Sequence, residues 1–255
     1  MLTVKVIRQL LEKNHVPAHL MNRLRADERK GVRELMERYD RRFLAQQQER
    51  FRLMKMYSLE IREGMDLGLT AGIDEAGRGP LAGPVYAAAV ILPLGLSIPG
   101  LKDSKKLSAE KRGQLRILIE QEALAVGWGY GTVEEIDRFN IWEATVLAMR
   151  RAVRQLGLSP GLLLVDGSLA PQLGECPVRA VVDGDNRSAS IAAASIVAKE
   201  RRDRIMDQLD QLYPEYGFSR HKGYGTADHY DALARFGPSP VHRRSFLHPE
   251  REGSW

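Results

Sequence analysis

Acidic side chains follow three apolar segments of the sequence. Asp74 and Glu75 follow AGI, Asp166 follows LLLV, and Asp183 and Asp185 follow RAVV. Short apolar runs of this kind are typical of buried strands, and acids at the ends of neighbouring strands converge. Clustered carboxylates repel one another unless a cation neutralises them, and oxygen ligands select Mg²⁺ or Mn²⁺. Two such ions, about 4 Å apart, can activate water and stabilise the leaving oxygen in phosphodiester cleavage.

Each acid also has a purely structural interpretation. An aspartate after a strand often caps a helix or forms a turn. In the run VVDGDN, either Asp183 or Asp185 could be the ligand while the other shapes the turn. Periodicity alone does not decide between them.

A glycine-rich turn, Gly77–Arg78–Gly79, comes directly after the first acidic pair. Glycine lets backbone amides approach a ligand closely, and Arg78 adds a further donor. Such a turn is a weak signal alone, but its place immediately after a strand that ends in Asp and Glu makes it a candidate binding element.

The elements that must position these groups indicate an α/β fold. The sequence predicts a strand hairpin over residues 69–92, further strands at AVGWGYGTV, LLLVDG and VRAVVDGD, and helices between and after them. A hairpin followed by strands alternating with helices predicts a mixed central sheet flanked by helices. The predicted helices cover residues 104–121, 140–156, 188–212 and 228–235.

The N-terminal segment is different in character. Residues 1–65 show helical spacing of apolar residues, and Gly64 to Gly68 ends the pattern. We therefore expect a helical extension over 1–68 and a catalytic domain with C-terminal helices over 69–255. Residues 1–70 contain 15 Lys and Arg against 10 Asp and Glu, which accounts for the net charge of +5. A basic extension suggests an anionic partner, although a solvated helical face has the same pattern.

Composition narrows the class of protein. The sequence has no run of about 18 apolar residues, so it predicts no membrane span. Charged residues in MLTVKVIRQLLEKN interrupt any signal-peptide core. The single cysteine, Cys176, cannot form an internal disulfide. We expect a cytoplasmic protein.

The sequence resembles the ribonuclease HII family, the type 2 ribonucleases H. The similarity covers about residues 69–245 and lies in blocks that occur in the family's order. These blocks are GIDEAGRGPLAGPVYAAAVIL, DSKKLS at 103–108, LLVDG at 163–167, GDNRSASIAAASIVAKERRD at 184–203, YGFSRHKGYGT at 216–226 and HRRSF at 242–246.

The resemblance implies a ribonuclease H-like fold and a set of site residues. It assigns two divalent cations, Mn²⁺ or Mg²⁺, to Asp74, Glu75, Asp166 and Asp185, and so selects Asp185 over Asp183. It assigns recognition of the ribose 2′-hydroxyl to Gly77, Arg78, Gly79 and Tyr224. Lys105 and Lys222 lie in signature blocks and are candidate phosphate contacts.

The implied activity is endonucleolytic. The enzyme would hydrolyse the RNA strand of RNA–DNA hybrids and nick 5′ of single ribonucleotides in duplex DNA, leaving 5′-phosphates, as in ribonucleotide excision. Two alternatives are a ribonuclease HIII-like nuclease and a nucleic-acid-binding module without activity. Arg78 and the helical extension favour ribonuclease HII, and the presence of all four acids favours an enzyme.

The extension would bind duplex phosphates, an unknown protein partner, or the catalytic domain as a stabilising arm.

Overall fold

The computed structural model describes residues 2–12 and 16–247. These described residues form two compact units, which divide between Arg52 and Leu53. No helix in the described part of the chain is long and apolar enough to cross a membrane. We expect the catalytic domain to reach residue 255, and the structure describes it as far as residue 247.

The first unit is helical, as expected. It contains α1 (Val4–Glu12), α2 (Ala18–Arg25) and most of α3 (Lys30–Met56). Apolar side chains at helical spacing meet in one small core, because each helix places its apolar positions on one face. The buried members of that core are Ile7, Leu11, Leu24, Val32 and Met36.

The sequence pattern predicts one helix from about Asp27 to Glu63, but the structure divides it at Tyr57. The helix α3 ends at Met56, and α4 (Ser58–Gly64) follows it. Leu53, Met56 and Tyr57 are buried in the main core of the second unit. Residues 53–64 therefore pack with the catalytic core, although the sequence pattern places them with the extension. The boundary at residue 68 remains a prediction.

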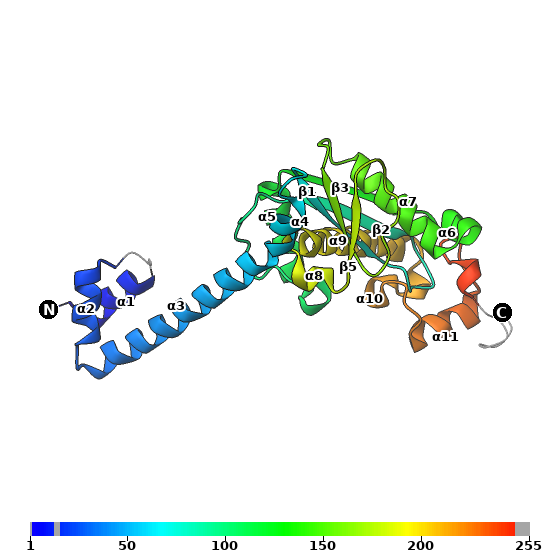
Figure 1. The fold of residues 1–255 in the computed structure, drawn as a ribbon. Coiled ribbons are helices and arrows are strands. Elements are labelled where there is room, and N and C mark those ends of the chain that lie inside the picture. Colours follow the sequence, from blue (N-terminus) through cyan, green and yellow to red (C-terminus); the bar gives the residue numbers. More distant parts are fainter. Residues whose placement is uncertain (1, 13–15, 248–255) are drawn as a thin grey trace. The chain divides into compact units, whose positions relative to one another are not determined.

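A mixed sheet is the centre of the second unit (Figure 1). Its order is β3-β2-β1-β4-β5, with β1 antiparallel to β2 and parallel to β4, and β4 parallel to β5. The carboxyl ends of β1, β4 and β5 therefore lie at one edge. The strands are β1 (Thr70–Ala76), β2 (Val85–Ile91), β3 (Ala125–Gly131), β4 (Leu162–Asp166) and β5 (Val178–Val181).

Helices pack on both faces of this sheet. On β2, Ala88 and Val90 belong to the core that contains α9 (Ala189–Leu212), while Ala87 and Ala89 belong to the core that contains α7 (Ile141–Arg154). The first ten residues of α9 are all buried. Small side chains let this helix approach the sheet closely: a Cβ on Gly72 would lie 2.1 Å from the backbone carbon of Ser190.

The remaining elements complete the second unit. The segment predicted as one helix over 104–121 is a 3₁₀ turn, η1 (Ser104–Lys106), followed by α5 (Ala109–Glu122), which Ser108 caps. The periodicity did not predict α6 (Val133–Phe139), whose signal is a capping box between Thr132 and Glu135. The others are α8 (Gly184–Arg187), η2 (Pro214–Tyr216), α10 (Phe218–His221), α11 (Ala227–Phe236) and η3 (Arg244–Phe246).

Candidate active site

The predicted acids lie at the shared carboxyl edge of three strands. Asp74 and Glu75 are near the end of β1, Asp166 ends β4, and Asp185 lies in α8, the short helix that follows β5. Because β1, β4 and β5 are adjacent and parallel, the fold brings these carboxylates to one side of the sheet.

Burial and mutual repulsion make this cluster electrostatically unfavourable. Asp74 is 7% exposed, and burial, followed by the charges of Glu75 and Asp166, raises its pKa well above the ordinary value. Burial also raises the pKa of Glu75, although Arg78 opposes this effect. Burial and the charges of Asp103 and Asp166 raise the pKa of Asp185 to about 6. A bound cation would relieve all three effects.

Hydrogen bonds fix the orientation of two of the acids. Asp74 accepts from the Glu75 amide at 2.7 Å and from the Ser195 hydroxyl, whose oxygen lies 2.8 Å from that of Ser104. Asp166 accepts from the Gly184 amide at 2.7 Å, which ties the start of α8 to the end of β4. Asp74 and Asp166 are therefore held by neighbouring backbone amides, and Asp74 also by α9.

The two alternative aspartates have different surroundings. Asp183 has a φ of 57°, in the left-handed region, is exposed, and accepts from the side-chain amide of Asn186 at 2.7 Å. Asp185 is 8% exposed, and the charge of Asp166 helps to raise its pKa. These surroundings favour a turn role for Asp183 and a ligand role for Asp185, which remains a proposal.

A fifth acid, Asp103, was not predicted. It caps η1 by accepting from the Lys105 amide at 2.9 Å, and its side chain is hydrogen-bonded to Asp185. Lys106 lies 3.6 Å from Asp103 and donates to Asn186 at 3.0 Å, so η1 is joined to α8. The available signal was the acid at the start of DSKKLS, but only the tertiary structure brings it to Asp185.

The chemistry of these side chains fits a hard divalent cation. The donors are carboxylates, and burial and neighbouring negative charges raise the pKa of Asp74 and of Asp185 without an opposing positive side chain. In the described part of the chain, no three His, Cys, Asp or Glu side chains are yet close enough to form a metal-binding group.

Most of the predicted substrate-binding residues line one pocket of about 270 Å³ beside the acids. Asp74 and Glu75 form part of its wall. The other lining residues are Ala76, Gly77, Arg78, Gly79, Ser104, Lys105, Ser195, Lys199 and Tyr224. Arg78 lies 3.4 Å from Glu75, and Tyr224 is 46% exposed. The structure thus places the glycine turn and the tyrosine next to the first acidic pair.

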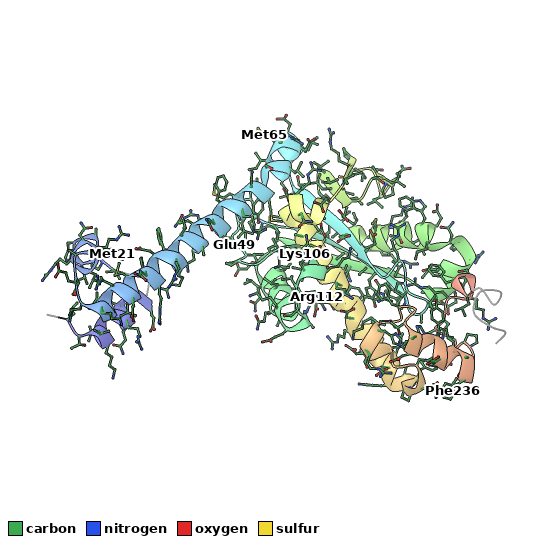
Figure 2. All side chains as sticks on the ribbon, turned by 90° about the horizontal axis from the view of Figure 1, so that it is seen from below. Met21, Glu49, Met65, Lys106, Arg112 and Phe236 are labelled. Atoms are coloured by element: carbon green, nitrogen blue, oxygen red, sulfur yellow. The ribbon has the colours of Figure 1, made fainter. Side chains whose placement is uncertain are left out.

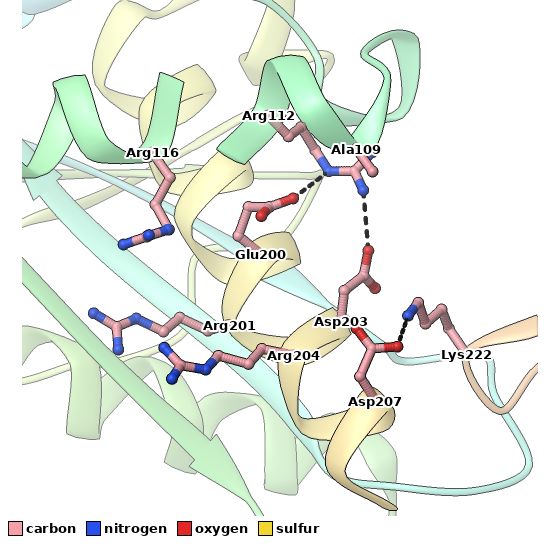
Figure 3. A pocket seen from close by; sticks show the side chains of 9 residues that line it. All are labelled: Ala109, Arg112, Arg116, Glu200, Arg201, Asp203, Arg204, Asp207 and Lys222. Carbon is pink, nitrogen blue, oxygen red and sulfur yellow. Dashed lines mark hydrogen bonds and ion pairs between the residues drawn. The ribbon is translucent and has the colours of Figure 1, made fainter. Parts of the chain in front are cut away.

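Lys222 lies elsewhere. It lines a neighbouring pocket between α5 and α9 and forms an ion pair with Asp207 (Figure 3). In the same pocket, Arg112 bridges Glu200 at 2.8 Å and Asp203 at 3.1 Å. Figure 2 labels Arg112, which lines this pocket, and Lys106, which contacts Asp103 and Asn186.

Two buried histidines support the loop that carries Tyr224. His229 Nδ1 lies 2.9 Å from the Tyr224 carbonyl oxygen, which can only accept, so this nitrogen carries the proton. Its Nε2 then accepts from His242 Nε2 at 2.9 Å, and His242 Nδ1 accepts from the Ser239 amide at 3.0 Å. Each imidazole is therefore satisfied in its neutral form.

This arrangement predicts a defined response to pH. Burial lowers the pKa of His229 and of His242 to about 4, from an ordinary value of 6.5. Because folding depresses both pKa values, their contribution to stability is present above pH 6.5 and is lost as pH falls toward 4. Imidazole ¹⁵N NMR should show both rings neutral at about pH 5.5, with Nδ1–H on His229 and Nε2–H on His242. Titration of either ring near its ordinary pKa in the folded protein would contradict this assignment.

The fold and the acid-bearing edge define the class of protein: a ribonuclease H-like nuclease fold. Similar solved structures include the ribonuclease H2 from Pyrococcus horikoshii OT3, at 28% identity and a TM-score of 0.58 over 69% of this chain and 93% of that one. The ribonuclease HII in the PCNA:RNase HII complex from Archaeoglobus fulgidus has 25% identity and a TM-score of 0.59 over 71% and 96%.

Sequence comparison gives the family. The model described as Ribonuclease HII matches residues 71–248, and the model described as Ribonuclease HII N-terminal domain matches residues 3–62. The ribonuclease HII of Geobacillus kaustophilus (strain HTA426) is 48% identical over 254 residues, covering 98% of this chain and 95% of that protein. That of Chlamydia pneumoniae is 56% identical over 182 residues, covering 71% and 84%. The chain therefore belongs to the ribonuclease HII family and is a type 2 ribonuclease H, which confirms the resemblance and disfavours the ribonuclease HIII alternative.

Proposed function

We propose that this endoribonuclease cleaves the RNA strand of RNA–DNA hybrids and nicks 5′ of single ribonucleotides in duplex DNA, with two divalent cations. One observation carries the proposal: the pocket that contains Asp74 and Glu75 is also lined by the glycine turn and by Tyr224. A group that could recognise ribose is therefore adjacent to a group that could support phosphodiester hydrolysis.

In this proposal, Asp74, Glu75, Asp166 and Asp185 hold the cations, Mn²⁺ or Mg²⁺. When bound, such ions supply water activation and charge stabilisation at the leaving oxygen. A solved ribonuclease HIII of this fold, 19% identical with a TM-score of 0.55, is described in complex with Mn²⁺. The chain's own contribution is to hold Asp74 through Ser195 and Asp166 through the Gly184 amide.

Recognition of the ribonucleotide is assigned to the turn and to Tyr224. A site built to hydrogen-bond a hydroxyl strongly rejects a substrate that lacks it, because its polar groups would remain unpaired. The half-exposed ring of Tyr224 can contact a sugar, and the guanidinium carbon of Arg202 lies 5.9 Å from the ring centroid on its protein side. Lys105, in the same pocket, is the favoured phosphate contact.

The neighbouring basic pocket is suited to a flanking phosphate. Arg116, Arg201 and Arg204 line it together with the paired Arg112 and Lys222 (Figure 3). Arg116 and Arg201 both pair with Glu120, at the margin of this pocket. Glu200, Asp203 and Asp207 also line this pocket, so its five basic side chains give it only a small excess of positive charge. This excess supports a phosphate contact with a duplex that extends over α9.

A duplex DNA with a single ribonucleotide tests the function directly. With Mn²⁺ or Mg²⁺ present, we expect one nick 5′ of the ribonucleotide, leaving a 3′-hydroxyl and a 5′-phosphate, and no nick in the all-DNA control. Excess chelator should abolish the reaction. Binding without cleavage in either metal would instead support a nucleic-acid-binding module, and cleavage that persists in chelator would contradict the role of the acids.

A further inference from the structure

Two buried arginines lie behind the glycine turn. Arg243 is 0% exposed and Arg202 is 1% exposed, and neither forms an ion pair with a carboxylate in the described part of the chain. Burying a guanidinium without an anion is costly, and apolar residues of similar volume usually serve stability equally well. Two unpaired buried charges beside a candidate active site therefore call for an explanation beyond stability.

Backbone carbonyls take the place of anions around both guanidiniums. Arg243 donates to the carbonyl oxygens of Gly77 at 2.6 Å, Arg78 at 2.9 Å, Pro80 at 2.8 Å and Gly83 at 2.8 Å. A single side chain thus binds four carbonyls between Gly77 and Gly83, two of them in the glycine turn.

Arg202 extends the same arrangement. It donates to the carbonyl oxygens of Pro84 at 3.2 Å, Ala82 at 3.2 Å and Lys222 at 3.0 Å. It also explains why residue 77 is glycine: φ is 93°, and a Cβ there would lie 1.8 Å from Arg202 Nε. The turn and the loop of Lys222 are therefore tied to the same buried pair.

The hydrogen bonds from Arg243 to the Gly77 and Arg78 carbonyls also fix the direction of the amides that follow these carbonyls. In a trans peptide, the carbonyl and the following N–H point to opposite sides of the plane, and the described chain has no cis peptide bond. Because the Gly77 carbonyl faces Arg243, the Arg78 amide faces away from it. The Arg78 carbonyl likewise directs the Gly79 amide away. Neither amide donates to a protein group in the described residues, and both residues line the pocket.

We propose that Arg243, assisted by Arg202, is a positioning residue that aims the amides of Arg78 and Gly79 at the substrate's ribose hydroxyl oxygen. This inference rests on the proposed function. Arg243 sets how strongly the enzyme distinguishes a single ribonucleotide, which offers one 2′-hydroxyl, from a long hybrid, which offers many. It does not contact the substrate itself.

The variant Arg243→Lys tests this role because it keeps the charge but loses the planar, five-donor geometry that reaches four carbonyls. We expect kcat/KM on a single embedded ribonucleotide to fall roughly tenfold or more. The fall on a long hybrid should be at least several-fold smaller, so the ratio of the two values changes. Tyr224→Ala should change the ratio in the same direction. Arg244→Lys, at the exposed neighbouring position, is the matched control and should leave both values unchanged.

The possible outcomes distinguish a failure of the positioning role from a failure of the proposed function. If the wild-type enzyme cleaves neither substrate, the proposed function fails. If it cleaves both and Arg243→Lys lowers both rates equally, or lowers neither, the positioning role is overturned. A uniform loss is what general packing damage would produce, since it would not distinguish substrates.

A second measurement does not depend on the variant folding. In the wild-type protein with chelator present, the ¹H–¹⁵N resonances of Arg78 and Gly79 should shift with a duplex containing one ribonucleotide. They should shift much less with the same duplex made of DNA alone, at concentrations where both duplexes perturb other resonances equally. Identical responses of these two amides would overturn the proposal.

Discussion

Replacing Asp74 by Asn is expected to lower turnover roughly a thousandfold or more while leaving the protein folded. Asp74 is central to the acid cluster, since the charges of both Glu75 and Asp166 act on it and Ser195 holds it. The amide has nearly the same shape but lacks the negative charge needed to hold a cation. Steady-state nicking of the single-ribonucleotide duplex measures the effect.

The same substitution has a second expected consequence. Burial and like charges raise the pKa of Asp74, so its ionised form destabilises the metal-free fold, increasingly as pH rises above the ordinary value of 3.8. Asp74→Asn should therefore melt no lower than the wild type at about pH 7 in chelator. This result would separate lost chemistry from lost structure.

Two other aspartates provide the controls. Asp185→Asn should resemble Asp74→Asn, whereas Asp183→Asn should be far milder, because the Asp183 side chain is exposed and accepts from Asn186 within its own turn. Near-normal turnover in Asp74→Asn would sink the assignment of the acids. Equal losses in Asp183→Asn and Asp185→Asn would reopen the choice between them.

Deleting residues 1–68 is expected to prevent stable folding, whereas deleting residues 1–52 should leave a folded, active core. The longer deletion removes Leu53, Met56 and Leu59, all buried in the second unit. Each fully buried side chain of this kind contributes about 1.5–3 kcal/mol, and a whole domain has only about 5–15 kcal/mol.

The longer deletion also removes a buried polar contact. Glu60 accepts from the Ser188 hydroxyl at 2.7 Å and from the Ser190 amide at 3.0 Å, at the start of α9. Thermal unfolding followed by circular dichroism compares the two deletions directly. Equal melting temperatures would support the boundary at residue 68 and show that residues 53–68 are dispensable.

The shorter deletion also tests what the basic extension does. If residues 1–52 bind duplex phosphates, their removal should weaken affinity and lower the salt slope of log affinity by roughly 0.9 per lost contact. Unchanged affinity and slope would leave a protein partner or a structural arm. The exposed Phe43 and Phe51 would then be the first positions to examine.

The sequence by itself determined the strands and the family, and it predicted the acids that follow the strands, because these features depend on local patterns. Apolar runs predicted all five strands and pointed to the acids and the glycine turn that follow them. The resemblance to the family then selected Asp185 over Asp183. The helix α6 was not predicted because seven residues give too short a periodic signal, and its capping box was the better indication of a helix.

Tertiary structure alone decided which distant residues come into contact. Asp103 reaches Asp185 only because η1 docks beside α8, and Glu60 reaches α9 across 128 residues of chain to Ser188. Arg202 and Arg243 have the sequence character of ordinary surface charges, yet they are buried against carbonyls. Local patterns record the strength of an element's preference for helix or strand. Burial and partnership depend on packing between elements, which no single segment encodes.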